Sequence, residues 1–451
     1  MSNSISVHNF IHDEFKEFSS EDNVRSIPSI IDGFKDAQRK VIYGMTLFGS
    51  SKEKVSRLSS KIAVETNYSH GETSLSGTIV GLAQIFPGAN NINLLEPLGQ
   101  FGTRLDADAA SERYISTMKS SWFSQIIRDE DQILLKYKQD EGIAVEPECY
   151  YPILPLWLVN GTDGIGTGFA SSIYPRNPRE VAKLIGCIIR GEKVSDSVVE
   201  TALLPWFRDW KGLVKQLEFG RYEFHGCYEI VNTTTVKITE LPVGYSVDKF
   251  KSILIDLLDK NVIKDYDNNS KETGFEFIVT VPRDFTKLDN TKIMNTFKLI
   301  TRGSDVPTLW NTSGKIVRYD NVWLALQEFC SMRISKFAEW KDIRLQQYCT
   351  DIERLQCKAD FVKTWVSTPD IHLMSSHEIE KLILEKNPTA VMMDMIKTLM
   401  SMPIRQLTSD KIQELDEQIK TEVFNKTDLE QRLVQDLYKE AIQPVSRSKA
   451  F

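Results

Sequence analysis

The apolar and polar residues of the first third of the chain predict short amphipathic helices. Ser26 followed by Pro28 predicts a helix start, because Ser is a favoured cap and Pro suits the first turn. A second helix is predicted over residues 52–65, after a break at Gly49. Two short helices with a basic face, followed by a polar loop and another helix, are typical of a helix-turn-helix or winged-helix unit. The first helix would carry apolar Ile30, Ile31, Phe34, Val41, Ile42 and Met45.

The middle of the chain has a different pattern. Residues 228–244 and 274–282 are β-branched and aromatic runs bounded by Gly, Pro and Asn, which predicts strands. We therefore expect an α/β domain from roughly Tyr150 to Tyr319.

The last third predicts long helices. From Asn321 onward Pro and Gly nearly vanish, and apolar residues follow one another at alternating steps of three and four, as in a coiled coil. A second charged helical segment near residues 409–442 is expected to pack back antiparallel, with a small helical region between the two. The predicted seam consists of Leu345, Tyr348, Ile352, Leu355, Ala359, Val362 and Val366 on the first helix and Ile412, Leu415 and Ile419 on the second.

A glycine-rich stretch, NGTDGIGTGF at residues 160–169, follows an apolar run at 153–159. It matches neither GxxxxGK[ST] nor GxGxxG, and the sequence after it, SSIYPRNP, is predicted to be a turn rather than a helix start. Glycine lets another backbone or a ligand come close, so the stretch is expected to approach something other than ATP. The structural alternative is a tight turn that ends an apolar strand.

Composition narrows the class of protein. A chain of 451 residues with 41% hydrophobic content is long enough for roughly two to four globular domains. It has no apolar run of the ~20 residues that span a bilayer, and its N-terminus is too polar for a signal peptide, which predicts a cytoplasmic or nuclear protein. Six scattered cysteines without a CxxC pair indicate reduced thiols rather than a zinc site.

Charge is unevenly distributed along the chain. The net charge is −7, yet seven basic residues and only two acidic ones lie between Gly33 and Lys61. This excess fits either a solvated helix face or a face that binds phosphates.

One block, residues 67–117, combines several features: His70 before a glycine, an Asn90-Asn91 pair, the sequence GQFGTR, and Arg113-Tyr114. Each feature alone has an ordinary structural explanation. Together they resemble the DNA-cleavage core of type IIA DNA topoisomerases, in particular the eukaryotic branch and the medium subunit of the T-even-phage type, the equivalent of the bacterial A subunit. Further segments resemble the family in the same order: residues 22–45, 146–168, 238–244, 264–268 and 319–333.

The resemblance implies reversible transesterification, in which Tyr114 attacks a DNA phosphate and remains on the 5′ end. Arg113 matches the neighbouring arginine, whose planar fork can hold two phosphate oxygens. His70 and Arg39 match residues that the family uses beside the scissile phosphate. Ile165 matches an isoleucine that wedges between base pairs, with glycines that let the backbone reach the DNA. The remaining DNA contacts would come from Lys35, Lys40, Lys54, Arg57 and Arg104.

Three positions depart from the family pattern. Asp36 and Glu112 stand where the family usually has proline, and Ser69 replaces the first of two adjacent histidines. None removes an assigned catalytic group.

The resemblance also implies Mg²⁺ and ATP, for which the chain shows no site. Asp106 and Asp108 form a DxD that is interpreted as solvated loop, so no metal ligand is assigned. Because the chain begins with Met shortly before the first family motif, the ATPase and metal-binding domains are expected on a separate partner subunit. The short chain with eukaryotic-like motifs favours a viral or phage source.

The implied fold class is multidomain α+β. It comprises an N-terminal arm and winged-helix domain (1–148), a tower domain (149–319), and a long antiparallel coiled coil with a helical dimer gate (320–451). A homodimer would place two Tyr114 residues across one double-stranded DNA. The alternatives are a relative of the meiotic type that cleaves without resealing, against which the coiled coil argues, and a non-catalytic DNA-bridging coiled-coil dimer.

Overall fold

A computed structural model describes residues 6–451, except for the side chain of residue 404. Residues up to Ile334 form one compact unit together with Tyr438–Phe451, and Ser335–Leu437 form a second. The fold class is confirmed as mixed α+β.

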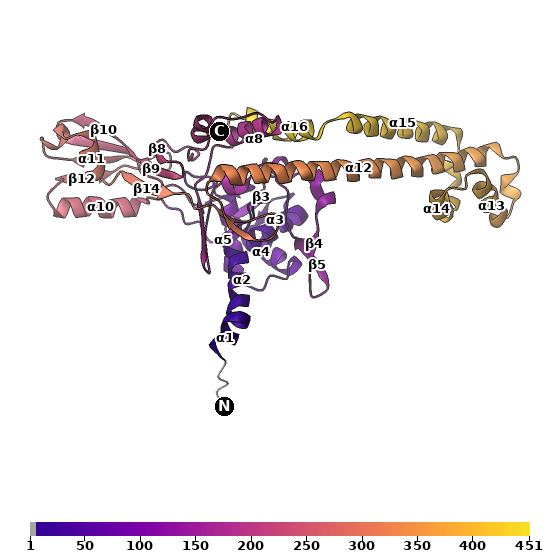
Figure 1. Cartoon of the computed structure of the whole chain (residues 1–451), viewed down its shortest axis with the longest axis horizontal. Helices are drawn as coiled ribbons and strands as arrows, with labels where there is room; N and C mark the ends of the chain where they lie inside the picture. The colour runs from indigo at the N-terminus through magenta and orange to yellow at the C-terminus, as the bar shows by residue number, and fades with distance from the viewer. Residues whose placement is uncertain (1–5) are drawn as a thin grey trace. The chain divides into compact units, whose positions relative to one another are not determined.

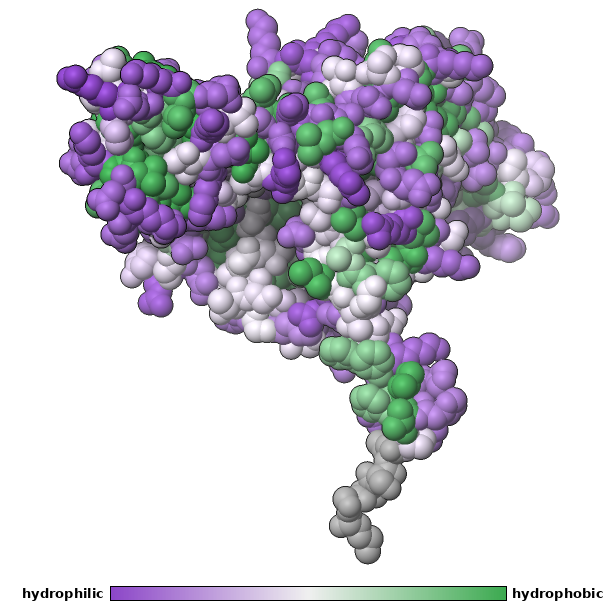
Figure 2. Space-filling view, turned by 60° about the vertical axis from the view of Figure 1, so that its left-hand side comes forward, coloured by the Kyte–Doolittle hydropathy of each residue, from purple (hydrophilic) through white to green (hydrophobic). Residues whose placement is uncertain are grey.

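The first unit begins with a helical segment, α1 (Val7–Phe10), a π-helical turn η1 (Ile11–Phe15) and α2 (Lys16–Ser26). Val7, Phe10, Ile11, Phe15 and Phe18 of this segment are exposed. Figure 2 shows apolar surface, in green, near the bottom of the view.

Three further helices follow: α3 (Asp36–Phe48), α4 (Val55–Glu65) and α5 (Glu72–Ala83). The helix start predicted at Ser26 is wrong, because Ser26 ends α2 and the next helix begins only at Asp36. Gly33, with φ of +74°, turns the chain between them, and a Cβ there would lie 2.5 Å from the main-chain nitrogen of Trp157. A close backbone contact therefore sets this boundary.

A small antiparallel sheet packs beside these helices, in the order β1 (Glu53–Lys54), β3 (Ser116–Lys119), β2 (Leu95–Leu98). The chain continues through α6 (Phe123–Ile126), the 3₁₀ turn η2 (Asp129–Leu134) and a hairpin of β4 (Tyr137–Asp140) and β5 (Ile143–Pro147).

The apolar run before the glycine-rich stretch forms a short buried helix, α7 (Leu156–Val159), and not a strand. The glycine-rich stretch itself is a hairpin of β6 (Thr162–Gly166) and β7 (Phe169–Ile173). The segment predicted as a turn, residues 171–178, holds the end of β7 and a loop, and Asn177-Pro178 at its end starts the helix α8 (Pro178–Ile189), which was not predicted. Asn177 caps that helix by accepting from the amides of Arg179 and Glu180, with Pro178 in the first turn. The short helix α9 (Asp196–Ala202) follows.

The strands predicted over residues 228–244 and 274–282 are present and belong to one antiparallel sheet, and this region holds a second antiparallel sheet that was not predicted. One sheet has the order β10 (Cys227–Asn232), β11 (Thr235–Glu240), β13 (Phe277–Thr280), β12 (Asp265–Asn268), and the other β14 (Ile300–Ser304), β9 (Arg221–His225), β8 (Leu213–Glu218). Figure 1 shows α10 (Val247–Asp259) beside the first sheet.

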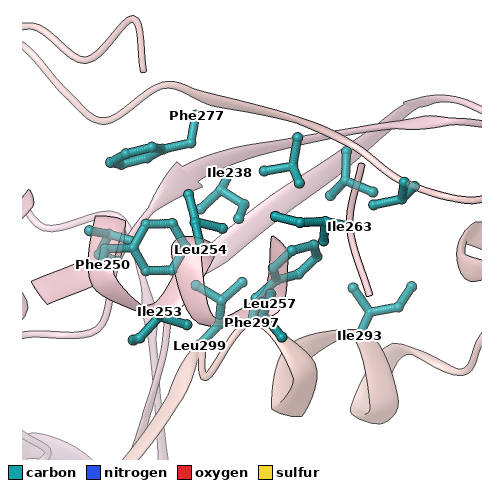
Figure 3. Packing of buried hydrophobic residues seen from close by; sticks show 14 of the residues in the cluster. Ile238, Phe250, Ile253, Leu254, Leu257, Ile263, Phe277, Ile293, Phe297 and Leu299 are labelled. Atoms are coloured by element: carbon teal, nitrogen blue, oxygen red, sulfur yellow. The ribbon is translucent and has the colours of Figure 1, made fainter. Parts of the chain in front are cut away.

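Figure 3 shows the core between α10 and that sheet, where Phe250, Leu254 and Leu257 meet Ile238 and Phe277. The short helix α11 (Asn290–Thr296) adds Ile293 to this core. A final pair, β15 (Thr308–Trp310) and β16 (Ile316–Arg318), leads to the long helix α12 (Val322–Ser367).

The second unit is helical. It holds the later part of α12, α13 (Ser376–Lys386), α14 (Ala390–Met400) and α15 (Ser409–Gln431), and α16 (Val434–Arg447) begins in it. Lys341 of α12 donates to the main-chain oxygens of Glu430 and Arg432, and Lys363 pairs with Asp416 at 3.0 Å. Later positions on α12 thus meet earlier positions on α15, so the two helices run antiparallel.

Seam residues Ile352, Ala359 and Val362 are buried in this unit, and Leu415 of α15 is buried in the same apolar cluster as Ala359 and Val362. Val366 is exposed. A dimeric coiled coil with a gate stays a prediction.

Candidate functional site

Tyr114 lies on a turn that main-chain hydrogen bonds hold in place. Its own amide donates to the oxygen of Ser111 at 2.8 Å. The first two amides of α4, which no helical carbonyl can reach, donate to Ile115 at 3.1 Å and to Glu112 at 3.3 Å. Glu112 contributes only its carbonyl here, so the departure from proline leaves this cap intact. The side chain of Tyr114 nevertheless points out, and the residue is 74% exposed.

Arg113 is exposed beside Tyr114. Its guanidinium carbon lies 5.9 Å from the centroid of the Tyr114 ring. A cation next to a phenol can stabilise negative charge on the phenolic oxygen or on a phosphate that it approaches. The pair fits nucleophilic chemistry on an anionic substrate.

His70 is exposed just before α5, with its ring 5.4 Å from that of Tyr68 in an edge-on arrangement. A groove of about 430 Å³ runs past it. The charged residues along this groove are Asp22, Arg25, Lys35 and Asp36. His70 is therefore open to a ligand on a surface of mixed charge.

Arg39 is not open in the same way. It is buried on α3, where Nε donates to Asp32 at 2.8 Å and Nη2 donates to Asp32 at 3.1 Å and to the oxygen of Phe34. Burial would lower the pKa of Arg39, but the charge and hydrogen bonds of Asp32 outweigh it and raise the pKa. Asp32 also accepts from the amides of Phe34 and Tyr150. In this structure Arg39 holds a buried carboxylate rather than facing an open phosphate site.

The other predicted DNA contacts fall into two groups. Lys54 and Arg57 are exposed at the start of α4, with Arg57 only 3.7 Å from Glu53. Lys40 instead binds Glu146 and the oxygen of Thr66, both at 2.9 Å, and Lys35 donates to the oxygen of Asp163 at 2.6 Å. Some of the basic residues between Gly33 and Lys61 therefore bind other groups of the protein and are not free to bind phosphates.

Arg104 does not fit the predicted phosphate contact. Its side chain is 9% exposed and pairs with Glu240 at 2.9 Å, with the guanidinium 5.0 Å from the centre of the Phe275 ring. Burial lowers the pKa of Arg104, which the charge of Glu240 partly offsets. It fixes its loop to the middle region of the first unit.

The glycine-rich hairpin presents Ile165 to solvent, 81% exposed. The predicted close approach is real, but the neighbour is helix α2. A Cβ on Gly164 would lie 2.1 Å from the main-chain oxygen of Ser26, and one on Gly166 would lie 2.3 Å from Oδ1 of Asn23. Contact with this helix accounts for Gly164 and Gly166, and the interpretation that the glycines let the backbone reach DNA stays a prediction.

The partners of two residues that the sequence singles out could not be found from the sequence. Asp36, one of the departures, pairs with Lys138 at 2.7 Å, and Lys138 also binds Glu146. Asn91 of the Asn90-Asn91 pair is buried, and its amide donates to three main-chain oxygens, those of Val159, Arg176 and Trp206. Partners this distant in sequence leave no local signal.

The residues present do not fit a metal ion. Asp106 and Asp108 are exposed, and Asp106 accepts from the amide of Asp108 at 3.1 Å, which is a local turn. Within residues 6–451, no group of three or more His, Cys, Asp or Glu side chains is placed to hold one.

They do not fit ATP either, because the glycine-rich stretch is a hairpin packed on α2 rather than a loop at a helix N-terminus. Across the part of the chain that the structure describes, no helix has the length and apolar character needed to cross a bilayer.

Comparison with known proteins adds a family. The family model for the A subunit of DNA gyrase/topoisomerase IV matches residues 25–443. DNA topoisomerase 2 of Saccharomyces cerevisiae is 37% identical over 368 residues, which cover 80% of this chain and 25% of that protein. DNA topoisomerase 2 top-2 of Caenorhabditis elegans is 34% identical over 404 residues, covering 87% and 25%. The chain thus spans about a quarter of these relatives.

A solved structure is similar over almost the whole chain. The DNA-binding, cleavage and re-ligation domain of Plasmodium falciparum topoisomerase II superposes with a TM-score of 0.87 at 30% identity. The match covers 98% of this chain and 64% of that one.

Proposed function

Because this chain belongs to the family of DNA gyrase/topoisomerase IV A subunits, we propose that it is the DNA-cleaving and religating part of an ATP-dependent type IIA topoisomerase. The phenolic oxygen of Tyr114 loses its proton and attacks a backbone phosphorus, the bond from phosphorus to the 3′ oxygen breaks, and that oxygen takes up a proton, so the step has no net proton change. The 5′-phosphotyrosyl bond retains the energy needed for religation by the reverse attack.

The observation that carries this proposal is the placement of Tyr114. Tyr114 is 74% exposed, so its phenol is accessible to a large substrate. Its backbone lies on a turn that is hydrogen-bonded to α4 and continues into β3, which limits its movement. Such preorganisation is what nucleophilic attack on a polymer backbone requires.

Neighbouring residues take roles that follow from their positions. Arg113 stabilises charge beside the phenol, and His70 hydrogen-bonds or exchanges a proton with the phosphate. Lys54 and Arg57 bind flanking phosphates. We assign Arg39 a positioning role through Asp32, because its guanidinium is held inside the protein.

Ile165 is proposed to be a wedge that enters the minor groove and bends the duplex. Exposing the apolar side chain of Ile165 to water is unfavourable in the free protein. Insertion between bases would remove it from water. Phe169, also on this hairpin, is 43% exposed and could add apolar contact.

At the level of domains, we propose a winged helix around α3–α5 and a tower in the middle region. The antiparallel helices α12 and α15 would form the coiled coil of a homodimer, which sets two Tyr114 residues across one duplex. A second duplex passes through the staggered break.

Mg²⁺ and ATP are assigned to a separate partner subunit. The support is that the matching family is named for an A subunit. The DNA topoisomerase 2 relatives are about four times as long as the segments that match, and they give this separate partner no support. A test therefore supplies the ATPase and metal-binding domains as purified protein from a relative.

The test of the catalytic role is plasmid cleavage. The chain is mixed with those domains, Mg²⁺ and supercoiled DNA, then denatured and digested with protease. The wild type should give linear DNA, and Tyr114→Phe should give none. Tyr137→Phe, at another exposed tyrosine, should cleave like the wild type. Should Tyr114→Phe also give linear DNA, the catalytic role of Tyr114 is excluded.

The same assay tests the non-catalytic alternative. A DNA-bridging dimer would retain duplex binding and give no linear DNA with either form of residue 114.

A further inference from the structure

We infer that helix α2 is a splint for the hairpin β6–β7, and that Gly164, Gly166 and Asn23 are positioning residues that fix the direction of Ile165. This inference rests on the proposed wedge role of Ile165. The new element is α2, which supports the hairpin while Ile165 enters the DNA.

Side chains alternate between the two faces of a β-strand, so one face of β6 can contact α2 while the other carries the wedge residue. Successive residues of β6 point to opposite faces, so Gly164 and Gly166 share one face and Ile165 lies on the other. The glycine face is filled by α2, because a Cβ at Gly164 would lie 2.1 Å from the Ser26 oxygen and one at Gly166 would lie 2.3 Å from Asn23 Oδ1. The atoms of α2 that leave no room for a side chain at Gly164 and Gly166 therefore also support the strand on the face opposite Ile165.

The backbone conformation does not explain these two glycines. Gly161 and Gly168 of the same stretch have φ of +73° and +81°, which favours glycine. Gly164 and Gly166 are not among the positive-φ glycines of the structure, so another residue could adopt their backbone. Contact with α2 is the remaining requirement at both positions.

Polar contacts tie the tip of the hairpin to α2 and its base to Lys35, the N-cap residue of α3. At the tip, Asn23 Nδ2 donates to the oxygen of Thr167 at 3.1 Å, and Thr167 Oγ1 donates to Asp22 at 2.7 Å. At the base, Lys35 donates to the oxygen of Asp163 at 2.6 Å. A two-stranded hairpin is only marginally stable alone, so these ties supply stiffness that it lacks.

Asn23 is an unusual side chain. It is 5% exposed, and its Oδ1 is buried against Gly166 with no hydrogen-bond partner in the structure. Burying an unsatisfied oxygen is unfavourable, so the side chain is held there by the hydrogen bond from Nδ2 to Thr167 and by packing against the hairpin. A wedge needs such backing, because unstacking bases opposes insertion with a few kcal/mol.

The test adds a methyl group and then makes room for it. Gly166→Ala should push the hairpin away from α2 and lower the bending equilibrium of bound DNA about tenfold. Asn23→Ala removes the oxygen that the methyl group meets, so Gly166→Ala should have less than about a twofold effect in that background. Gly164→Ala is the matched control without rescue, because it meets a main-chain oxygen that Asn23→Ala leaves in place.

Bending is measured on the full chain by fluorescence energy transfer between dyes at the two ends of a short duplex. Duplex affinity and thermal unfolding are recorded for every variant, and both should change little. In case Gly166→Ala fails to fold, Thr167→Val provides a second variant of nearly unchanged shape. It removes the bond to Asp22 and should weaken bending about two- to fivefold.

Each outcome bears on one claim. If Ile165→Ala bends DNA like the wild type, the wedge role fails and the splint loses its purpose. If Ile165→Ala abolishes bending but Gly166→Ala and Thr167→Val do not reduce it, the wedge stands and the splint is refuted. A Gly166→Ala effect on bending that is as large in the Asn23→Ala background as in the wild type would also refute it.

Discussion

At the scale of single residues, Arg39 shows what a motif cannot reveal. The sequence places it in a segment that resembles a catalytic motif, and the structure pairs it with buried Asp32, which lies seven residues earlier. Sequence similarity identifies the residue but not the partner that neutralises its charge. By contrast, the exposure of Tyr114 and Arg113 agrees with what a nucleophile and its cation need.

The first prediction concerns the stability that the Arg39–Asp32 pair provides. Arg39→Ala leaves the fully buried Asp32 carboxylate without its cation, so the free energy of unfolding should fall by about 3–5 kcal/mol. Urea denaturation of the whole chain measures this fall. Arg57→Ala, which loses an exposed pair with Glu53, should cost no more than about 1 kcal/mol. Equal costs for the two variants would contradict the assignment.

The second prediction concerns acid. Burial would raise the pKa of Asp36, but the hydrogen bond and charge of Lys138 outweigh burial and lower the pKa. A lowered folded-state pKa gives stability that is present above the unfolded value of about 3.9 and is lost as pH falls through the folded value. For this partly exposed pair the gain at neutral pH is about 0.5–1 kcal/mol.

The free energies of unfolding of wild type and Asp36→Asn, compared across this range, check the sign. The difference should be largest near neutral pH and shrink below about pH 4. A difference that stays constant or grows in acid would show that the ion pair with Lys138 does not stabilise the fold.

At the scale of elements, two segments that contain proline were assigned wrongly, in opposite directions. Ser26-Ile27-Pro28 predicted a helix start and marks a helix end, whereas Asn177-Pro178 was assigned to a turn and starts α8. Proline keeps the preceding residue extended, which suits both a helix end and an N-cap. The choice is made by tertiary contacts, such as that of Gly33 with Trp157, which the local sequence does not contain.

The glycine-rich hairpin was predictable in part. Its glycines do indicate a close approach, but a sequence cannot tell a ligand from a helix of the same chain.

The third prediction separates the stability of this hairpin from its function. Ile165→Ala should lower DNA bending and cleavage, while the free energy of unfolding changes by less than about 0.5 kcal/mol because the side chain is exposed. Energy transfer and denaturation on the same preparation give both values. Unchanged bending would reduce the hairpin to a structural turn.

At the scale of the whole molecule, the order of helical, strand-rich and helical regions could be read from periodicity. The long helix α12 and the strands around β11 and β13 appear where the pattern predicts them. The return of Tyr438–Phe451 to the first unit was not predictable, since its evidence is the contact of buried Tyr438 with the oxygen of Ile153 at 3.0 Å. The apolar residues at the end of a helix do not show which part of the chain they will pack against.

The fourth prediction tests the dimer. If each protomer cuts one strand, dimers that combine one wild-type chain with one Tyr114→Phe chain should nick plasmid DNA rather than linearise it. Co-expression with two affinity tags isolates the mixed dimers, and a denaturing gel separates nicked from linear product. Linear product from mixed dimers would show that the two strands are not cut by two copies of Tyr114.

The most direct measurement of the central claim is the identity of the residue that holds the DNA. After cleavage with the ATPase and metal-binding domains and Mg²⁺, the trapped protein is digested with nuclease and trypsin and analysed by mass spectrometry. We expect a nucleotide joined through its 5′ phosphate to Tyr114. A nucleotide on any other residue, or linear DNA without a nucleotide on Tyr114, would contradict it.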